Sequence, residues 1–155
     1  MTQPPPTRAM AWEAYFTTTS RLSERLEREL KRHCSLSLAE YNVLLQVSRS
    51  GEEGIRPATL ARQVVFSPSR LTHTLHRLQE RGLVERRRCE TDGRGEEIHL
   101  SAQGRTGFAA AAGLHRDVVR RLVLDDLVPG EEAVLERVFT RIAHRLDEDA
   151  RGARP

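Results

Sequence analysis

The sequence lacks the features of membrane proteins and of disulfide-rich secreted proteins. No apolar run approaches the roughly 18 residues that a membrane-spanning helix needs, and the longest, residues 108–114, is short and rich in alanine. Two cysteines, Cys34 and Cys89, are too few for a disulfide framework and are typical of a reducing compartment. Residues 1–7 contain three prolines and no apolar core of a signal peptide. We therefore expect a cytoplasmic protein.

Sequence motifs of enzymes and metal sites are also missing. The chain has no glycine-rich phosphate loop, no G-x-S-x-G elbow, no H-E-x-x-H and no paired-cysteine metal motif. His73 and His76 are three residues apart, but exposure or phosphate contact explains this pair better than a metal does. We therefore expect no catalytic activity, no metal and no cofactor.

Apolar residues are scarce for a folded domain. They make up 38% of the 155 residues, aromatic residues only 5%, and charged residues 30%. The length fits one domain, or a small domain with appended helices. So little apolar surface predicts that one protomer completes its core by pairing with a second copy.

The positive charge is concentrated in the middle of the chain. Overall, 25 Lys and Arg stand against 22 Asp and Glu, a net charge of +3. Residues 1–54 hold 7 charges of each sign, residues 55–105 hold 10 basic against 6 acidic, and residues 106–155 hold 8 against 9. A basic centre between neutral flanks indicates a module that binds a polyanion.

Two helices are predicted before the basic segment. Apolar residues at helical spacing indicate one helix over about residues 8–33. Ser37 and Glu40 form a capping box that begins a second helix. Gly51 and Gly54 end that helix and open a loop.

The basic segment begins with a short helix, a tight turn and another helix. Pro57 opens the short helix, which extends to about residue 64. Ser67 caps the next helix, which extends to about residue 81 and ends at Gly82. Its expected core stripe is Leu71, Leu75 and Leu78, and its opposite face carries Ser69, Arg70, Thr72, His73, His76 and Arg77.

A hairpin and two helices are predicted after residue 82. Residues 83–89 and 97–100 have strand character, with a turn-rich tip between them. Ser101 caps a helix expected over about residues 102–127, and a last helix is expected over about residues 131–148. The last helix has an unusually wide apolar stripe: Val134, Leu135, Val138, Phe139, Ile142 and Leu146.

This order of elements predicts a winged helix-turn-helix. The second helix of such a pair enters the major groove of DNA, and the basic hairpin is the wing. Hydroxyl, guanidinium and imidazole groups suit phosphate and base-edge contacts. The candidate DNA-binding residues are Ser67, Ser69, Arg70, Thr72, His73, Arg77, Arg86, Arg88 and Arg94.

The run from Leu60 to Arg105 resembles the MarR family of winged-helix transcription regulators, and the flanking helices match the layout of that family. The end of the recognition helix matches the family pattern L-x-x-x-G-L-V-x-R at Leu78, Gly82, Leu83, Val84 and Arg86. The wing pattern D-x-R and the closing L-[ST]-x-x-G pattern fall on Asp92, Arg94, Leu100, Ser101 and Gly104.

The resemblance implies a homodimer on a pseudo-palindromic operator in double-stranded DNA. It also implies that Arg94 enters the minor groove and that Asp92 orients the wing. Family members commonly bind small aromatic or phenolic effectors. Trp12, Tyr15 and Phe16 are candidates for such contacts, although a place in the dimer core explains them better.

Together these observations predict a mainly α fold with a small β-hairpin. Residues 1–36 are expected to be a tail and a dimerisation helix, residues 37–105 the winged helix-turn-helix domain, and residues 106–155 the C-terminal dimerisation helices. The expected function is a homodimeric, sequence-specific repressor that a small molecule releases from DNA. Two alternatives stay open: a redox-sensing regulator that uses Cys34 or Cys89, and a non-specific architectural DNA-binding protein.

Overall fold

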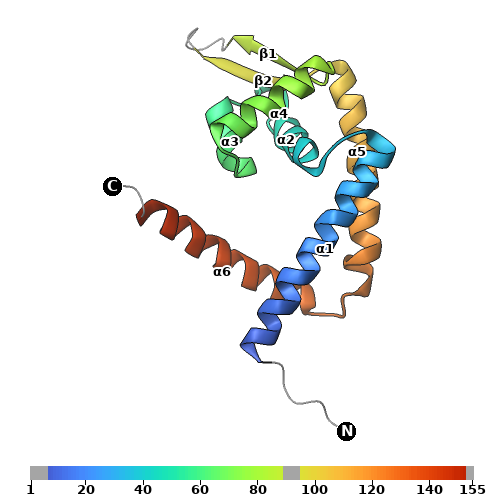
Figure 1. The fold of residues 1–155 in the computed structure, drawn as a ribbon, viewed down its shortest axis with the longest axis vertical. Helices are drawn as coiled ribbons and strands as arrows, with labels where there is room; N and C mark the ends of the chain where they lie inside the picture. Colours follow the sequence, from blue (N-terminus) through green and yellow to red (C-terminus); the bar gives the residue numbers. More distant parts are fainter. Residues whose placement is uncertain (1–6, 89–94, 153–155) are drawn as a thin grey trace. The chain divides into compact units, whose positions relative to one another are not determined.

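Helices and one short hairpin make up the fold, as the sequence predicts. The structure is a computed structural model, and it describes residues 7–88 and 95–152. Its elements are α1 (Arg8–Cys34), α2 (Leu38–Arg49), η1 (Gly51–Glu53), α3 (Pro57–Val64), α4 (Pro68–Glu80), β1 (Val84–Arg88), β2 (Glu96–Leu100), α5 (Ala102–Leu122), η2 (Leu124–Asp126) and α6 (Glu131–Gly152) (Figure 1). The chain divides into two units, residues 1–116 and 117–155, so α5 begins in the first and ends in the second.

The helix boundaries follow the predicted caps. Ser37 Oγ accepts a hydrogen bond from the Glu40 N–H at 3.1 Å, and Glu40 Oε2 accepts one from the Ser37 N–H at 2.8 Å. This is the capping box that the sequence indicates at the start of α2. At the end of α4, Gly82 has a φ of 66°, where a side chain would be strained.

The core of the first unit lies among the end of α1, α2, α3, α4 and the hairpin. Its most deeply buried side chains are Leu30, Val43, Leu44, Val47, Leu60, Leu75, Leu78 and Ile98, each no more than 1% exposed. α5 joins this core through Tyr41, whose ring stacks on those of Phe108 and His115. Burial lowers the pKa of His115, because the apolar surroundings disfavour its charged form.

The hairpin is antiparallel, and a third segment supports it. Val84 lies opposite Leu100, and Arg88 lies opposite Glu96. On the other edge of β2, the Ile55 N–H donates to the Ile98 carbonyl at 3.1 Å, and the Ile98 N–H donates back at 2.9 Å. The loop after α2 therefore anchors the hairpin to the core, an arrangement that the sequence analysis does not predict.

Two predicted helix ends are wrong. α5 ends at Leu122 rather than near residue 127, and residues 124–126 form a separate 3₁₀ turn. Asp125 and Asp126 explain the early end, because negative charge is unfavourable at the C-terminus of a helix. α6 continues to Gly152, beyond the predicted end at residue 148.

Much of the apolar surface on α6 faces solvent in the single chain. Leu135 and Phe139 are 39% and 40% exposed, and Leu146 is 65% exposed. The predicted stripe is thus present on the helix. No helix in the described part of the chain is long and apolar enough to span a membrane.

Candidate nucleic-acid interface

α3 and α4 meet at a tight turn. The N–H of Phe66 donates to the Ala61 carbonyl at 2.9 Å, which closes the end of α3. Val65 is left with a φ of 55° and is 86% exposed. Ser67 Oγ then accepts the Arg70 N–H at 3.3 Å and begins α4. Ser67, a predicted DNA contact, is therefore also the N-cap of this helix.

α4 has one buried face and one exposed face. Leu71, Thr74, Leu75 and Leu78 are buried, and Thr74 donates its hydroxyl hydrogen to the Arg70 carbonyl at 2.9 Å. The exposed residues are Ser69, Arg70, Thr72, His73, His76 and Arg77. The predicted division into a core stripe and an outer face is confirmed.

Arg70 is held on the outer face by an aromatic ring. Its guanidinium carbon lies 3.9 Å from the centroid of the Phe66 ring, a cation–π arrangement. Stacking restrains a long side chain while its N–H donors stay available to a partner. Arg70 is therefore positioned to bind an anion or a base edge beside the N-terminus of α4.

Glu40 contacts α4 from the start of α2. Glu40 is only 6% exposed. Its Oε1 lies 3.5 Å from Arg77 Nε, and its Oε2 lies 3.5 Å from Arg81 Nη1. Arg77, a predicted DNA contact, thus has a carboxylate partner within the chain. Glu40 was predicted only as part of the capping box, because sequence spacing gives no sign of a contact between α2 and α4.

The hairpin places three consecutive arginines, Arg86, Arg87 and Arg88, on alternating faces of β1. Arg86 Nη1 lies 2.9 Å from Glu96 Oε2 on the opposite strand. Arg87 points to the other face of the hairpin from Arg86. It is paired there with Glu85, which lies two residues earlier on the same strand. Arg88 is exposed. The expected wing-tip residues Asp92 and Arg94 lie outside the described residues.

The remaining candidates lie outside α4 and the hairpin. Trp12 stacks on Phe16 with ring centroids 5.7 Å apart, and Tyr15 lies 5.8 Å from Trp12. Trp12 and Phe16 are about 60% exposed, which makes this an aromatic cluster on the surface of α1.

The redox alternative receives no support from Cys34. Burial raises the pKa of this thiol, and a raised pKa lowers the fraction of reactive thiolate. Cys89, the other predicted candidate, lies outside the described residues. Among the described residues, no group of three or more His, Cys, Asp or Glu side chains could hold a metal ion.

Comparisons with known proteins agree on one family. The model of the MarR family matches residues 35–95. AbsC, a MarR family transcriptional regulator from Streptomyces coelicolor, is 29% identical, covers 96% of this chain and 99% of its own, and has a TM-score of 0.86.

Two further solved structures have a similar fold. Sco3205, a MarR family regulator from the same organism in complex with DNA, is 29% identical over 91% of this chain and 93% of its own, with a TM-score of 0.84. CouR from Rhodococcus jostii, bound to p-coumaroyl-CoA, shares the fold at 20% identity over 82% of this chain and 87% of its own, with a TM-score of 0.73. No protein of curated function matches the sequence.

Proposed function

We propose that this chain is a member of the MarR family of DNA-binding transcription regulators, to which residues 35–95 and the fold are similar. In this proposal it is a homodimeric, sequence-specific repressor that a small molecule releases from its operator. α4 lies in the major groove in this proposal, and the hairpin follows the adjacent minor groove. The target is a pseudo-palindromic site with half-sites about one helical turn apart.

The exposed face of α4 is the observation that carries the proposal. It presents hydroxyl, imidazole and guanidinium groups above a fully buried leucine stripe, and it lies in the segment with the net positive charge. Side chains of these types donate to phosphates and base edges. Arg86 and Arg88 are proposed to extend the contact along the wing, with Arg94 at its tip and Asp92 orienting it.

Apolar surface on the terminal helices supports a dimer. The stripe on α1 is exposed at Trp12 and Phe16 and becomes buried at Leu26 and Leu30. α6 is exposed along its own stripe. Exposed apolar residues along a helix are typical of a protein–protein contact, and a two-fold dimer presents two copies of α4 to the two half-sites.

An effector is proposed from the relatives and from the aromatic cluster of Trp12, Tyr15 and Phe16. CouR, with the same fold, is seen bound to p-coumaroyl-CoA. Exposed rings that contact one another offer a surface on which a flat aromatic ligand can stack. The dimer contact and the effector contact compete as roles for these three residues.

Substitution of Arg70 tests sequence-specific binding. The operator is first selected from a random DNA library with the wild-type protein, and affinities are then measured at fixed salt. We expect Arg70→Ala to weaken operator binding by about 1–3 kcal/mol and to relax the sequence preference. Arg70→Lys keeps the charge but loses the planar, stacked guanidinium, so the preference should fall while the salt dependence is retained.

The control is Arg32→Ala, which removes an exposed arginine from the end of α1. It should leave the preference for the operator over random DNA unchanged. If Arg70→Ala weakens binding equally on all sequences, Arg70 touches only phosphate. If the wild-type protein has no preferred sequence, it is a non-specific architectural protein and the proposal is wrong.

Glu40→Gln should make binding less specific. Glutamine keeps an acceptor for the Ser37 N–H but removes the charge that Arg77 and Arg81 face. With both guanidiniums free to contact phosphates, affinity for random duplex DNA should rise. The slope of log affinity against log salt should steepen by about 0.9 for each added phosphate contact.

Glu80→Gln is the matched control for Glu40→Gln. It removes one negative charge from α4 itself, but this carboxylate is 63% exposed and lies 3.3 Å from His76 Nδ1. Equal salt slopes for the two variants would show that the effect is one of net charge and that the contact with Glu40 has no role.

A further inference from the structure

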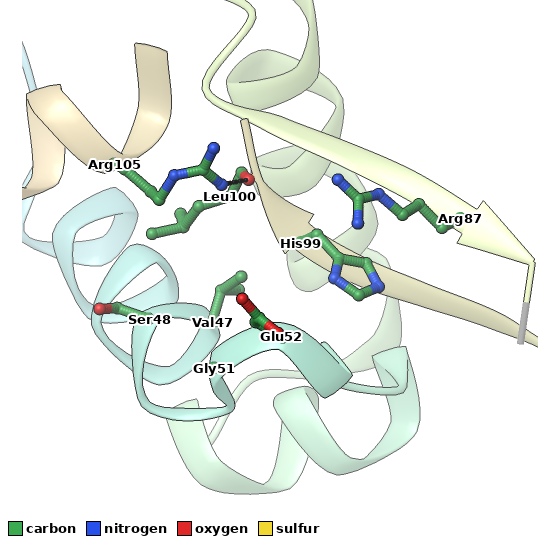
Figure 2. A pocket seen from close by; sticks show the side chains of 8 residues that line it. All are labelled: Val47, Ser48, Gly51, Glu52, Arg87, His99, Leu100 and Arg105. Carbon is green, nitrogen blue, oxygen red and sulfur yellow. Dashed lines mark hydrogen bonds between the residues drawn. The ribbon is translucent and has the colours of Figure 1, made fainter. Parts of the chain in front are cut away.

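A cavity of about 660 Å³ lies on the opposite side of the hairpin from Arg86 and Arg88. It is bounded by the end of α2, by η1, by both strands and by the start of α5. Its lining residues are Val47, Ser48, Gly51, Glu52, Arg87, His99, Leu100 and Arg105 (Figure 2). None of these residues belongs to the proposed DNA-contacting set or to the aromatic cluster on α1.

The lining has one positive charge in excess. Arg87 and Arg105 contribute two positive charges and Glu52 one negative charge. Arg105 Nη1 donates to the Leu100 carbonyl at 2.9 Å, which fixes the guanidinium against the wall of the cavity and uses one of its five N–H donors. Arg87 is already paired with the carboxylate of Glu85, so Arg105 is the stronger anchor for a single anionic group.

Two side chains of the lining, those of Val47 and Leu100, are apolar. Val47 and Leu100 are 1% and 8% exposed. His99 is 7% exposed, and the structure gives its Nε2 no hydrogen-bond partner; the nearest carboxylate oxygen, on Glu97, is 3.9 Å away. A Cβ added at Gly54 would overlap this imidazole, so the ring lies directly against the backbone of Gly54. A volume of this size is typical of a small-ligand site.

We propose that this cavity binds a small monocarboxylate with an aliphatic chain. The carboxylate binds Arg105 with support from Arg87, and the chain packs on Val47 and Leu100. A metal cation is disfavoured by the two guanidiniums. Inorganic phosphate is also disfavoured, because it has no apolar part that could pack on Val47 and Leu100.

The regulatory consequence rests on the proposed function. A ligand here touches η1, both strands and α5 together, and Arg87 lies between two residues proposed to contact DNA. The bound molecule therefore links the base of the wing to the end of α2. Occupancy should change operator affinity, and ligand binding can be measured separately on the protein without DNA.

Calorimetric titration of the full chain, without DNA, tests the site with three probes. Hexanoate should bind saturably with one site per chain. 1-Hexanol, which has the chain but no charge, should bind at least about tenfold more weakly, since a charged hydrogen bond is worth about 1.5–3 kcal/mol. Inorganic phosphate should also bind more weakly. Equal binding of hexanoate and either control probe would overturn the proposal.

Variants locate the site on the chain. Arg105→Gln and Arg87→Gln should each weaken hexanoate binding, by about tenfold or more for Arg105→Gln. Arg121→Gln removes an exposed arginine from the same helix as Arg105 and should bind hexanoate like the wild type. Circular dichroism checks that each variant is folded. If Arg105→Gln unfolds, Arg87→Gln still tests the site, because Arg87 lies at an exposed position of β1.

DNA titrations with and without hexanoate then test the consequence. A change in operator affinity with hexanoate in the wild type, absent in Arg87→Gln, supports the link to the wing. Saturable hexanoate binding without any preferred DNA sequence would sink the proposed function and leave the ligand site standing. Absence of hexanoate binding in a chain that binds its operator would sink only the ligand site.

Discussion

Gly104→Ala is expected to lower the free energy of unfolding by about 3 kcal/mol or more. Gly104 lies in the first turn of α5, where a Cβ would overlap the backbone carbonyl oxygen of Leu83. A flexible side chain could move aside, but this oxygen belongs to the main chain between α4 and β1. It also accepts the Ser101 N–H at 3.2 Å, so it cannot shift without breaking that bond.

Gly104→Ala should also disturb the proposed DNA-binding surface. The Ser101 hydroxyl donates to the Gly82 carbonyl at 2.5 Å, so the start of α5 is bonded to two of the three residues, Gly82 and Leu83, that link α4 to β1. Moving α5 away would disturb the end of α4 and the beginning of β1 together. Operator binding should therefore fall along with stability.

Gly113→Ala is the matched control for Gly104→Ala. It lies on the same helix, and a Cβ there would meet no atom within 4 Å. Alanine is the better helix former by about 0.5–1 kcal/mol, so this variant should be slightly more stable than the wild type. Urea unfolding followed by circular dichroism, at one fixed protein concentration, measures both. Similar midpoints for the two variants would contradict the role given to Gly104.

Local signals made most of the helix boundaries predictable. Ser37 with Glu40, Ser67 with Pro68, and Gly82 act through hydrogen bonds and backbone angles within a few residues, so their effect can be worked out from the sequence. The predicted end of α5 near residue 127 is wrong because Asp125 and Asp126 disfavour the C-terminal turn of a helix, which ends at Leu122 instead.

Contacts between distant segments could not be predicted. Ile55 pairs with Ile98 across more than forty residues, and one isolated residue has no strand pattern to reveal it. Glu40 reaches Arg77 and Arg81 only because α2 and α4 pack together. The outer face of α4 was predictable because helical periodicity alone divides it from the leucine stripe. What each residue pairs with depends on tertiary packing.

Leu135→Asp should dissociate the proposed dimer. Leu135 lies on the exposed apolar stripe of α6, and in a two-fold dimer each substitution is present twice. Burying a carboxylate without a partner costs at least about 2 kcal/mol, so two copies would raise the dimer dissociation constant roughly a thousandfold. Light scattering at micromolar protein concentration measures the oligomeric state directly.

Thr140→Asp is the control on the same helix. Thr140 is exposed among polar residues, with Glu136, Arg137 and Arg141 around it, so an added carboxylate stays in water and the dimer should persist. Leu135→Asp should also lose affinity for a palindromic operator, because a single subunit reaches only one half-site. A monodisperse dimer of Leu135→Asp would show that the stripe on α6 is not the interface and that the chain pairs through another surface.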